Sequence, residues 1–281
     1  MKILVTGATG FIGRHLITEL IAGGHEVIAL GLEDRKTLSF PWLDKVRYIQ
    51  YDLSENSADC YDRFHRPDRL IHLCWAGLPN YKELFHIEKN LFESYFFIKQ
   101  LVLGGVKDVT VLGTCFEYGL QEGCLSEDAD ARPVNPYGLA KDCLRKFLQE
   151  LNLKHPFNFK WVRLFYLYGA GQNKNSILEL LKQALDNNDE VFNMSGGEQE
   201  RDYLPVEKVA EYIAKISMKD DFCGIVNCCS GRPVSIRSLV ENYLRENHKS
   251  IKLNLGYYPY PDYEPMAFWG NNNKLRKLIE E

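Results

Sequence analysis

Near its start the chain reads Lys2-Ile3-Leu4-Val5-Thr6-Gly7-Ala8-Thr9-Gly10-Phe11-Ile12-Gly13, and this stretch decides the fold. The aliphatic run 2–6 predicts a strand, and apolar residues at helical spacing over 11–22 predict a helix. The glycines between them permit a tight turn and let a pyrophosphate approach the backbone, while the start of the helix offers free N–H groups to it. The stretch therefore predicts a dinucleotide-binding loop with cofactor contacts from Gly7, Thr9, Gly10, Phe11 and Ile12.

The following residues alternate short apolar runs with helical patterns. Further strands are predicted at 26–30, 46–51, 69–74, 108–112 and 159–165, and helices at 84–103, 136–151 and 176–187. Continuous apolar strands that alternate with helices predict an α/β protein of Rossmann type, with a doubly wound parallel sheet covered on both faces. Ligands of such a sheet bind at the carboxyl ends of its strands.

The pattern loosens after about residue 168, where Asn and Gly appear in clusters. One more strand is predicted at 224–228, before a helix that Ser235 is placed to cap. We therefore predict a cofactor-binding domain over 1–168, to which a segment at about 204–230 returns. Residues 169–281 are predicted to form a smaller substrate-binding region that covers the edge of the sheet.

Composition excludes several classes of protein. The 281 residues are 45% hydrophobic and 26% charged, which argues against a disordered, collagen-like or coiled-coil chain. A net charge of −4 creates no field that would attract nucleic acid or an anionic membrane, and no apolar run approaches the roughly 18 residues of a membrane span. The eight cysteines form no C-x-x-C pair, which predicts free buried thiols in a reducing cytoplasm and no metal site.

The end of the second predicted strand bears on the choice of cofactor. NAD-binding proteins of this kind usually carry Asp or Glu there to hold the ribose 2′-hydroxyl, but this chain has Gly31. A missing carboxylate removes repulsion of a 2′-phosphate, which Arg35 is suited to bind in bidentate fashion unless it only belongs to a solvated loop. With Arg14 also nearby, NADP(H) is preferred and NAD(H) is left open. Asp52 and Leu53, after the third strand, are expected at the adenine.

The segment Tyr137-Gly138-Leu139-Ala140-Lys141 predicts the reacting groups. Residues four apart share one helix face, so the phenol of Tyr137 and the ammonium of Lys141 are expected to be neighbours. We expect this positive charge to lower the pKa of Tyr137 from about 10, so that the phenol exchanges a proton with a carbonyl or alcohol oxygen. Lys141 is also placed to anchor the nicotinamide ribose, and Asn135 to cap the helix. The alternative is an ordinary amphipathic helix.

Thr114 ends the fifth predicted strand, where ligands of a parallel sheet bind. Its hydroxyl is predicted to hydrogen-bond the same substrate oxygen as Tyr137. The alternative is a strand-end threonine that bonds its own backbone.

Together these motifs resemble the extended short-chain dehydrogenase/reductase family, in its nucleotide-sugar branch. The resemblance runs from Met1 to about residue 240, and it includes the glycine loop and the Thr, Tyr and Lys of the predicted site. The fourth-strand motif of the family is similar to Ile71-His72-Leu73-Cys74-Trp75-Ala76-Gly77, which implies that Ala76 and Gly77 meet the cofactor. Asn90 matches a helix asparagine that supports the site and the cofactor in the family.

Two later segments extend the resemblance toward the substrate. The sixth-strand motif is similar to Arg163-Leu164-Phe165-Tyr166-Leu167-Tyr168-Gly169, and the segment whose Arg clamps the diphosphate is similar to Arg201-Asp202-Tyr203-Leu204-Pro205-Val206. The chain has Tyr166 where Asn is usual, Pro205 where His is usual, and Pro261 where a second Arg is usual. The resemblance implies substrate contacts from Tyr166 and from Arg201, the latter as the main cation.

The residues after Thr114 separate the reactions of this branch. Dehydratases carry Asp and Glu there to eliminate water, whereas this chain has Cys115 and Phe116, which are expected to contact the substrate. Glu117 points away from the site if the alternation of the strand continues. The resemblance therefore implies that the chain is not a dehydratase.

An exchangeable NADPH suits a reductase better than an epimerase, which keeps its NAD. We therefore predict NADPH-dependent reduction of the 4-keto group of a 4-keto-6-deoxyhexose linked to dTDP or CDP, in deoxysugar and surface-polysaccharide biosynthesis. Tyr137 would donate the proton to C4 oxygen, and Thr114 would stabilise the developing charge. An NAD-dependent nucleotide-sugar 4-epimerase stays open, as does a non-catalytic NADP(H)-sensing protein. The resemblance also implies a homodimer through the helices at 84–104 and 136–151.

Overall fold

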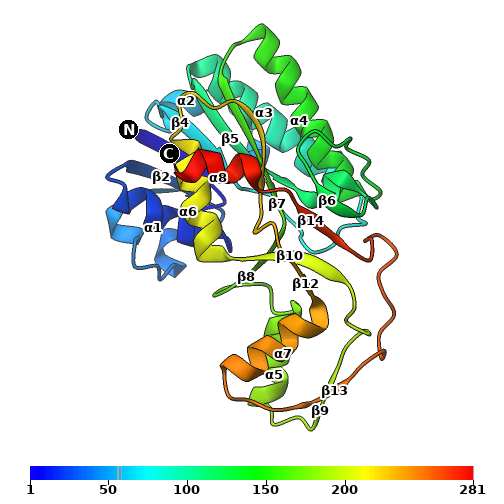
Figure 1. The fold of residues 1–281 in the computed structure, drawn as a ribbon. Coiled ribbons are helices and arrows are strands. Elements are labelled where there is room, and N and C mark those ends of the chain that lie inside the picture. Colours follow the sequence, from blue (N-terminus) through cyan, green and yellow to red (C-terminus); the bar gives the residue numbers. More distant parts are fainter. Residues whose placement is uncertain (56, 58, 281) are drawn as a thin grey trace.

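A seven-stranded parallel sheet organises the computed structural model, which describes residues 1–55, 57 and 59–280. Its strands lie in the order β11-β7-β5-β4-β1-β2-β3, and each pairs in parallel with its neighbours (Figure 1). The predicted doubly wound α/β architecture is confirmed. The bounds are β1 Lys2–Thr6, β2 Glu26–Gly31, β3 Arg47–Gln50, β4 Arg69–His72, β5 Asp108–Thr114, β7 Asn158–Leu164 and β11 Gly224–Cys228.

Helices cover both faces of this sheet (Figure 1). One face carries α1 Gly13–Ala22, α6 Val206–Ser217 and α8 Asn273–Glu280, and the other carries α2 Cys60–Arg63, α3 Leu91–Gly104 and α4 Pro136–Lys154. Alternate residues of a strand serve the two layers: Leu4 belongs to one buried cluster, while Ile3 and Val5 belong to the other. This double burial is why the strands read as continuous apolar runs.

Two predicted elements have different ends in the structure. The fourth strand ends at His72 rather than at residue 74, because the N–H groups of Leu73 and Cys74 each donate to the hydroxyl of Thr6 at 3.2 Å. The helix predicted at 84–103 begins with a π-helical turn, His86–Asn90, before it continues as α3. Such turns are frequent at functional sites.

A smaller unit lies below the main sheet in Figure 1. It contains the three-stranded sheet β12-β10-β8, formed by Pro233–Ser235, Glu200–Pro205 and Tyr166–Tyr168. It also contains the helices α5 Ile177–Asp186 and α7 Ile236–Glu246 and the parallel pair β9 Val191–Asn193 and β13 Lys252–Asn254. Ser235 caps α7 as predicted, since its hydroxyl accepts the N–H of Ser238.

The segments that return to the main layer extend beyond the predicted 204–230. Strand β11 and helix α6, which fall largely within that segment, lie in the main layer. Residues 268–280, which were expected in the smaller region, lie against the main unit as well. Strand β14 Phe268–Gly270 pairs with β6 Gly123–Leu125. Helix α8 contacts α6 and β11 and buries Leu275 there. The apolar stripe of this last helix covers sheet edge that would otherwise face water.

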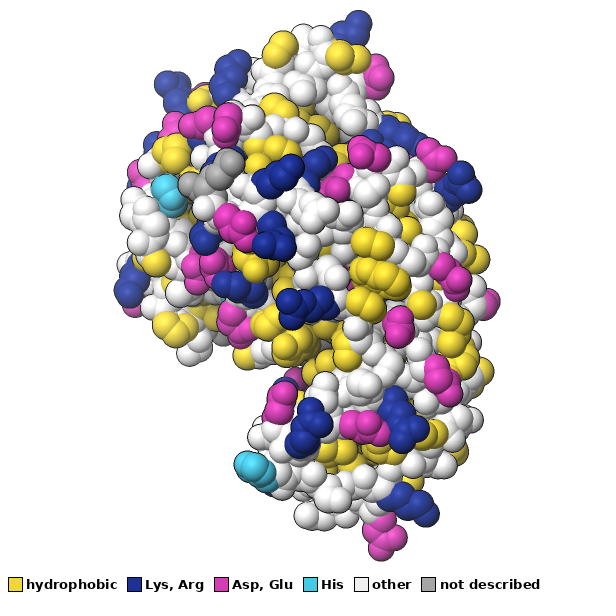
Figure 2. Space-filling view, in the orientation of Figure 1, with side chains coloured by type: hydrophobic (Ala, Val, Ile, Leu, Met, Phe, Trp, Pro, Cys, Tyr) yellow, Lys and Arg dark blue, Asp and Glu magenta, His cyan; other side chains and the backbone are white. Residues whose placement is uncertain are grey.

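The surface and the composition agree with a fold built around one large sheet that is buried between two layers of helices. Charges of both signs are interspersed over the face drawn in Figure 2. Within the described residues, no helix combines the length and the apolar character needed to cross a membrane, and no cluster of three or more His, Cys, Asp or Glu side chains could hold a metal. The cysteines are free, but they are not all buried as predicted, because Cys124 and Cys223 are exposed.

Candidate active site

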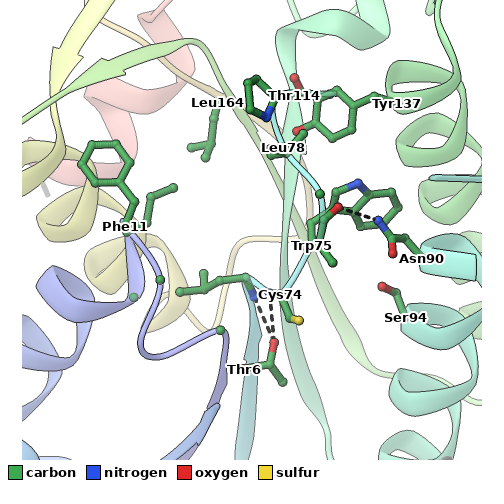
Figure 3. A pocket seen from close by; sticks show the side chains of 18 of the residues that line it. Thr6, Phe11, Cys74, Trp75, Leu78, Asn90, Ser94, Thr114, Tyr137 and Leu164 are labelled. Atoms are coloured by element: carbon green, nitrogen blue, oxygen red, sulfur yellow. Dashed lines mark hydrogen bonds between the residues drawn. The ribbon is translucent and has the colours of Figure 1, made fainter. Parts of the chain in front are cut away.

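A cavity of about 730 Å³ lies at the carboxyl ends of the parallel strands. The glycine loop and the ends of β1 and β2 form one part of its wall, and the loop after β4, the end of β5 and the start of α4 form another. Figure 3 looks into the cavity, with Phe11 on one side and Trp75 and Tyr137 on the other. The strand ends thus bring the predicted cofactor loop and the predicted reacting groups to one space.

The glycine loop has the shape that a pyrophosphate requires. Gly7 has a φ of +67°, and a Cβ at Gly13 would lie 2.2 Å from the carbonyl oxygen of Gly7, so larger residues would force the loop open. Helix α1 begins at Gly13 after Ile12, and in the described part of the chain no side chain caps it and no acid stands in its first turn. The N–H groups of Arg14 and His15 donate to backbone carbonyl oxygens, whereas those at 11–13 have no hydrogen-bond partner among the described residues and are available to an anion. These features fit the diphosphate of a dinucleotide.

The loop after β4 is held in place around the cavity. The hydroxyl of Thr6 holds its first two N–H groups, and Asn90 Nδ2 donates to the carbonyl oxygen of Ala76 at 2.9 Å (Figure 3). Gly77 has a φ of +84°, and a Cβ there would lie 2.2 Å from the ring of Phe85. Ala76, Gly77 and Asn90 all line the cavity. The predicted supporting role of Asn90 thus corresponds to a direct bond with the loop.

A carboxylate occupies the space beside Gly31 that the sequence analysis took to be free of charge. A Cβ at Gly31 would lie 3.1 Å from Glu33 Oε2 and 2.6 Å from Tyr48 Oη, so this position leaves no room for a side chain. Glu33 Oε2 accepts the hydroxyl of Thr9 at 2.9 Å and lines the cavity. An acid therefore stands next to the phosphate loop, two residues beyond the usual place.

The structure does not bring the two predicted cationic cofactor residues to the cavity wall. Arg35 pairs with Asp44 at 2.8 Å on the surface, and it is not among the described residues that line the cavity. Arg14 donates to the carbonyl oxygen of Gly10 at 3.3 Å and lies over the ring of Phe40. The predicted adenine neighbours Asp52 and Leu53 do line the cavity.

Tyr137 and Thr114 lie side by side at one end of the cavity (Figure 3). Asn135 begins α4, and its Oδ1 accepts the N–H of Gly138 at 2.8 Å, which places Tyr137 in the first turn of the helix. Burial raises the pKa of Tyr137 well above its usual value, and a hydrogen bond with Thr114 opposes this only in part. The phenol is therefore protonated near neutral pH, contrary to the expectation of a lowered pKa.

The reason lies in where the ammonium of Lys141 points. Its Nζ donates to the carbonyl oxygen of Leu112 at 2.9 Å and lies 3.9 Å from the centroid of the Trp75 ring. Lys141 is 3% exposed, and this burial lowers its pKa to about 7. The ammonium thus sits beneath the cavity surface, one helical turn from Tyr137, and its charge does not compensate for the burial of the phenol.

Glu117 faces away from the cavity, but not for the reason that strand alternation suggested. The strand ends at Thr114, and Cys115–Tyr118 form a 3₁₀ turn that Thr114 caps. Glu117 is fully buried and accepts the N–H of Thr114 at 2.8 Å and Arg163 Nε at 2.7 Å. This carboxylate stabilises the turn that carries Thr114, and it does not contact the cavity.

The substrate end of the cavity is aromatic. Cys115, Phe116 and Tyr166 line it as predicted, and Phe116 stacks on Tyr81 with a centroid distance of 4.7 Å. Arg201 is absent from the described lining, since it is buried behind Tyr166 and pairs with Glu264 at 2.9 Å.

The structure also reveals lining residues that the sequence analysis missed. They include Glu33, Trp75, Tyr81, Glu93, Gln172 and Asn173. Trp75 and Tyr81 follow the carboxyl end of a parallel strand, and that position alone predicts ligand contact. Gln172 and Asn173 belong to an Asn/Gly cluster in which no pattern marks individual residues.

Comparison with known proteins agrees with this geometry. Residues 3–229 match the model of the NAD dependent epimerase/dehydratase family, and the chain belongs to that family.

Particular relatives extend the likeness to the whole chain. A dTDP-6-deoxy-L-talose 4-dehydrogenase (NAD(+)) from Aggregatibacter actinomycetemcomitans is 32% identical over 273 residues, covering 96% of this chain and 99% of that protein. A GDP-6-deoxy-D-talose 4-dehydrogenase from the same organism is 27% identical, covering 99% and 91%. Among solved structures, MoeE5 in complex with UDP-glucuronic acid and NAD is 25% identical with a TM-score of 0.83, covering 100% and 93%.

Proposed function

We propose that this chain reduces the 4-keto group of a nucleotide-linked 4-keto-6-deoxyhexose, a reaction that runs in reverse as a 4-dehydrogenation. The observation that carries the proposal is the pair of hydroxyls of Tyr137 and Thr114 at the end of a cavity built on a dinucleotide loop. The dTDP-linked and GDP-linked 4-dehydrogenases among the relatives support C4 of a 6-deoxy sugar as the reacting carbon.

The two hydroxyls have different roles at the C4 oxygen. When bound, the dinucleotide supplies the hydride. The protonated phenol of Tyr137 is ready to donate its proton, because burial keeps it neutral in the free protein. The Thr114 hydroxyl donates a hydrogen bond to the same oxygen and stabilises the negative charge that develops there. The buried Lys141 supplies a cation one turn below.

For the cofactor we propose NAD(H) ahead of NADP(H). The sequence had favoured NADP(H). Glu33 places a carboxylate beside the loop, where it is suited to accept a ribose hydroxyl and to repel a 2′-phosphate. Arg35, the residue expected to bind that phosphate, is paired with Asp44. The NAD(+) in the name of the dTDP-sugar relative supports the same preference.

The aromatic wall supports a 6-deoxy sugar. Phe116 and Tyr81 line the cavity and stack with a ring-centroid distance of 4.7 Å, so a methyl group at this wall would meet aromatic surface. We place dTDP first as the nucleotide and CDP second, with Arg201 as a diphosphate contact once its pairing with Glu264 is released.

A nucleotide-sugar 4-epimerase is the second candidate. The NAD-type carboxylate Glu33 favours it, because an epimerase of this kind retains its NAD throughout the reaction. It predicts interconversion of two sugars without net consumption of NADH. A protein that only senses the cofactor would neither interconvert sugars nor oxidise NADH.

The deciding experiment follows the absorbance of NADH and NADPH with dTDP- and CDP-linked 4-keto-6-deoxy sugars. We expect stoichiometric oxidation of NADH, and a loss of about 10²–10⁴-fold in kcat for Tyr137→Phe with cofactor affinity unchanged. Tyr212→Phe, in α6 and outside the described lining of the cavity, serves as the matched control with normal turnover. Full activity in Tyr137→Phe would refute the role of the phenol, and sugar interconversion without oxidation of NADH would favour the epimerase.

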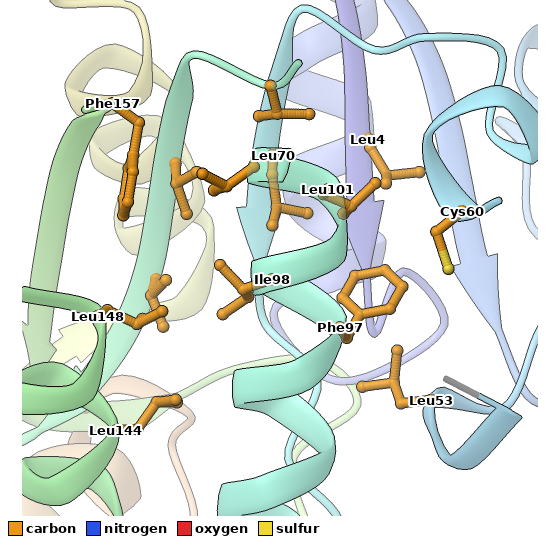
Figure 4. Close-up of a cluster of buried hydrophobic side chains, with 14 of the residues drawn as sticks. Leu4, Leu53, Cys60, Leu70, Phe97, Ile98, Leu101, Leu144, Leu148 and Phe157 are labelled. Carbon is orange, nitrogen blue, oxygen red and sulfur yellow. The ribbon is translucent and has the colours of Figure 1, made fainter. Parts of the chain in front are cut away.

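We also propose a homodimer through α3 and α4. Helix α3 turns Phe97, Ile98 and Leu101 into the core (Figure 4), while Phe92 and Phe96 on its other side are 43% and 40% exposed. Tyr95 joins them to the exposed Phe147 of α4 at a centroid distance of 5.5 Å. A contiguous exposed aromatic strip of this kind favours contact with a second copy of the chain.

A further inference from the structure

The face of the Trp75 indole covers the ammonium of Lys141. The distance of 3.9 Å from Nζ to the ring centroid lies well inside the range of a cation–π interaction. Nζ also donates to the carbonyl oxygen of Leu112, and the side chain is almost fully buried. An ammonium has three N–H donors, so this carbonyl and the indole face replace part of the water that burial removes.

The indole is itself held by a buried histidine. Trp75 Nε1 donates to His86 Nδ1 at 3.0 Å, and therefore His86 carries its proton on Nε2, which donates to the carbonyl oxygen of Asn80 at 3.0 Å. Burial lowers the pKa of His86, which keeps the ring neutral and Nδ1 free to accept. The π-helical turn that begins α3 places His86 at this point. Asn80, His86 and Trp75 thus form a chain of contacts that ends on Lys141.

Several other titratable groups surround the ammonium. They are His72 at the end of β4, Cys74 in the loop after it, Glu117 from the turn after β5, His86 from the π-helical turn and Tyr137 from α4 itself. Burial acts most strongly and lowers the pKa of Lys141, while Glu117 and Cys74 act in the opposite direction. Burial outweighs the other two effects and leaves the pKa of Lys141 at about 7, so near neutral pH a further contact that favours the charged form changes how much ammonium is present.

We propose that Trp75, held by His86, is a positioning residue that keeps the Lys141 ammonium charged and in place beneath the reacting end of the cavity. An aromatic face attracts a cation and gives no comparable stabilisation to a neutral amine. If the indole turned away, the buried His86 Nδ1 would lose its 3.0 Å hydrogen bond from Trp75 and keep only the longer contact with Asn90 Nδ2 at 3.4 Å. The catalytic use of Lys141 rests on the proposed function, whereas its contact with Trp75 does not.

The contact is tested first without any substrate or cofactor. Tryptophan fluorescence is followed against pH in the wild type and in Trp75→Phe, and the difference isolates this indole from Trp42, Trp161 and Trp269. We expect the difference to titrate near pH 7 and the transition to vanish in Lys141→Met. Absence of a transition, or one that persists in Lys141→Met and so belongs to His86 or another neighbour, would overturn the proposal.

The second measurement is the pH profile of NADH oxidation with the 4-keto sugar. Activity that needs the ammonium falls as pH rises through the pKa of Lys141, so a lower pKa moves this alkaline limb to lower pH. We expect a shift of about one pH unit in Trp75→Leu and a smaller shift in Trp75→Phe, which keeps an aromatic face. Trp269→Phe, in β14 and outside the cavity, is the control with an unchanged profile.

The outcomes separate this inference from the proposed function. An alkaline limb that does not move in Trp75→Leu overturns the inference even if the enzyme is active. If the wild type oxidises NADH with none of the sugars, the proposed function fails, and a fluorescence transition that depends on Lys141 still supports the contact.

Discussion

At the scale of single residues, the site depends on where a few charges are directed. Lys141 was expected to act on the phenol of Tyr137, and Arg35 was expected to bind a 2′-phosphate. In the structure, Lys141 donates to the carbonyl oxygen of Leu112 and Arg35 pairs with Asp44. Glu33 shows the opposite behaviour, since its position along the chain is unusual but its carboxylate reaches the phosphate loop. Spacing along a chain predicts neighbours, and it does not predict which way a long side chain points.

The cofactor preference is tested at Glu33. We expect Glu33→Gln to shift the ratio of NADH to NADPH affinity toward NADPH by about tenfold or more, because a hydrogen bond to a charged acceptor and the repulsion of a 2′-phosphate are both lost. The measurement is the dissociation constant of each cofactor by fluorescence titration.

Arg35→Ala is the matched control for this variant. Its surface pair with Asp44 contributes little, so both cofactors should bind as they do to the wild type. Selective loss of NADPH binding in Arg35→Ala would instead support the 2′-phosphate contact that the sequence suggested.

At the scale of elements, helix α4 carries Tyr137 and Lys141, the proposed reacting groups, in its first two turns. Its start is held by Asn135, whose Oδ1 accepts the N–H of Gly138, and the N–H of Tyr137 donates to the carbonyl oxygen of Tyr81 at 3.2 Å. The turn after β5 is held in a similar way by the buried Glu117. Two element ends, one of a helix and one of a strand, therefore set the distance between Tyr137 and Thr114.

A comparison of two helix caps tests this. Asn135→Ala and Ser235→Ala each remove a side chain that accepts a backbone N–H at the start of a helix, and each should lower the free energy of unfolding by about 1 kcal/mol. Only Asn135→Ala should also lower kcat, because only α4 carries the phenol. Denaturant unfolding and steady-state kinetics measure the two effects. Equal turnover in both variants would show that the cap does not position Tyr137.

At the scale of the whole molecule, the layers place the cavity and leave one outer surface apolar. The glycine loop, the loop after β4 and the end of β5 meet because their strands are parallel neighbours in the sheet. On the outer side of the helix layer that covers one face of this sheet, α3 and α4 lie side by side, and Phe92, Phe96 and Phe147 are exposed. A second copy of the chain bound to this surface would therefore cover the outer side of α4, the helix that carries Tyr137.

The proposed dimer is tested by introducing a charge into this strip. Sedimentation should give about twice the chain mass of 32.5 kDa for the wild type and the single mass for Phe96→Glu, because a buried unpaired carboxylate disfavours the contact. Leu180→Glu, at an exposed apolar position of α5, is the control that should remain dimeric. A wild type of single mass would refute the dimer.

The sequence by itself determined the sheet, the phosphate loop and the helix with Tyr137 and Lys141, because apolar periodicity, glycine spacing and helix caps are local properties of the chain. It also placed Thr114 at the end of a strand, and the resemblance to the family marked Asn90; both residues line the cavity. Only the tertiary structure decided that the Glu33 carboxylate lies beside Gly31, that Trp75 covers Lys141, and that Arg201 is buried against Glu264. These are contacts between segments distant in sequence or between flexible side chains, and their energies depend on burial and on competing partners that exist only once the layers have packed.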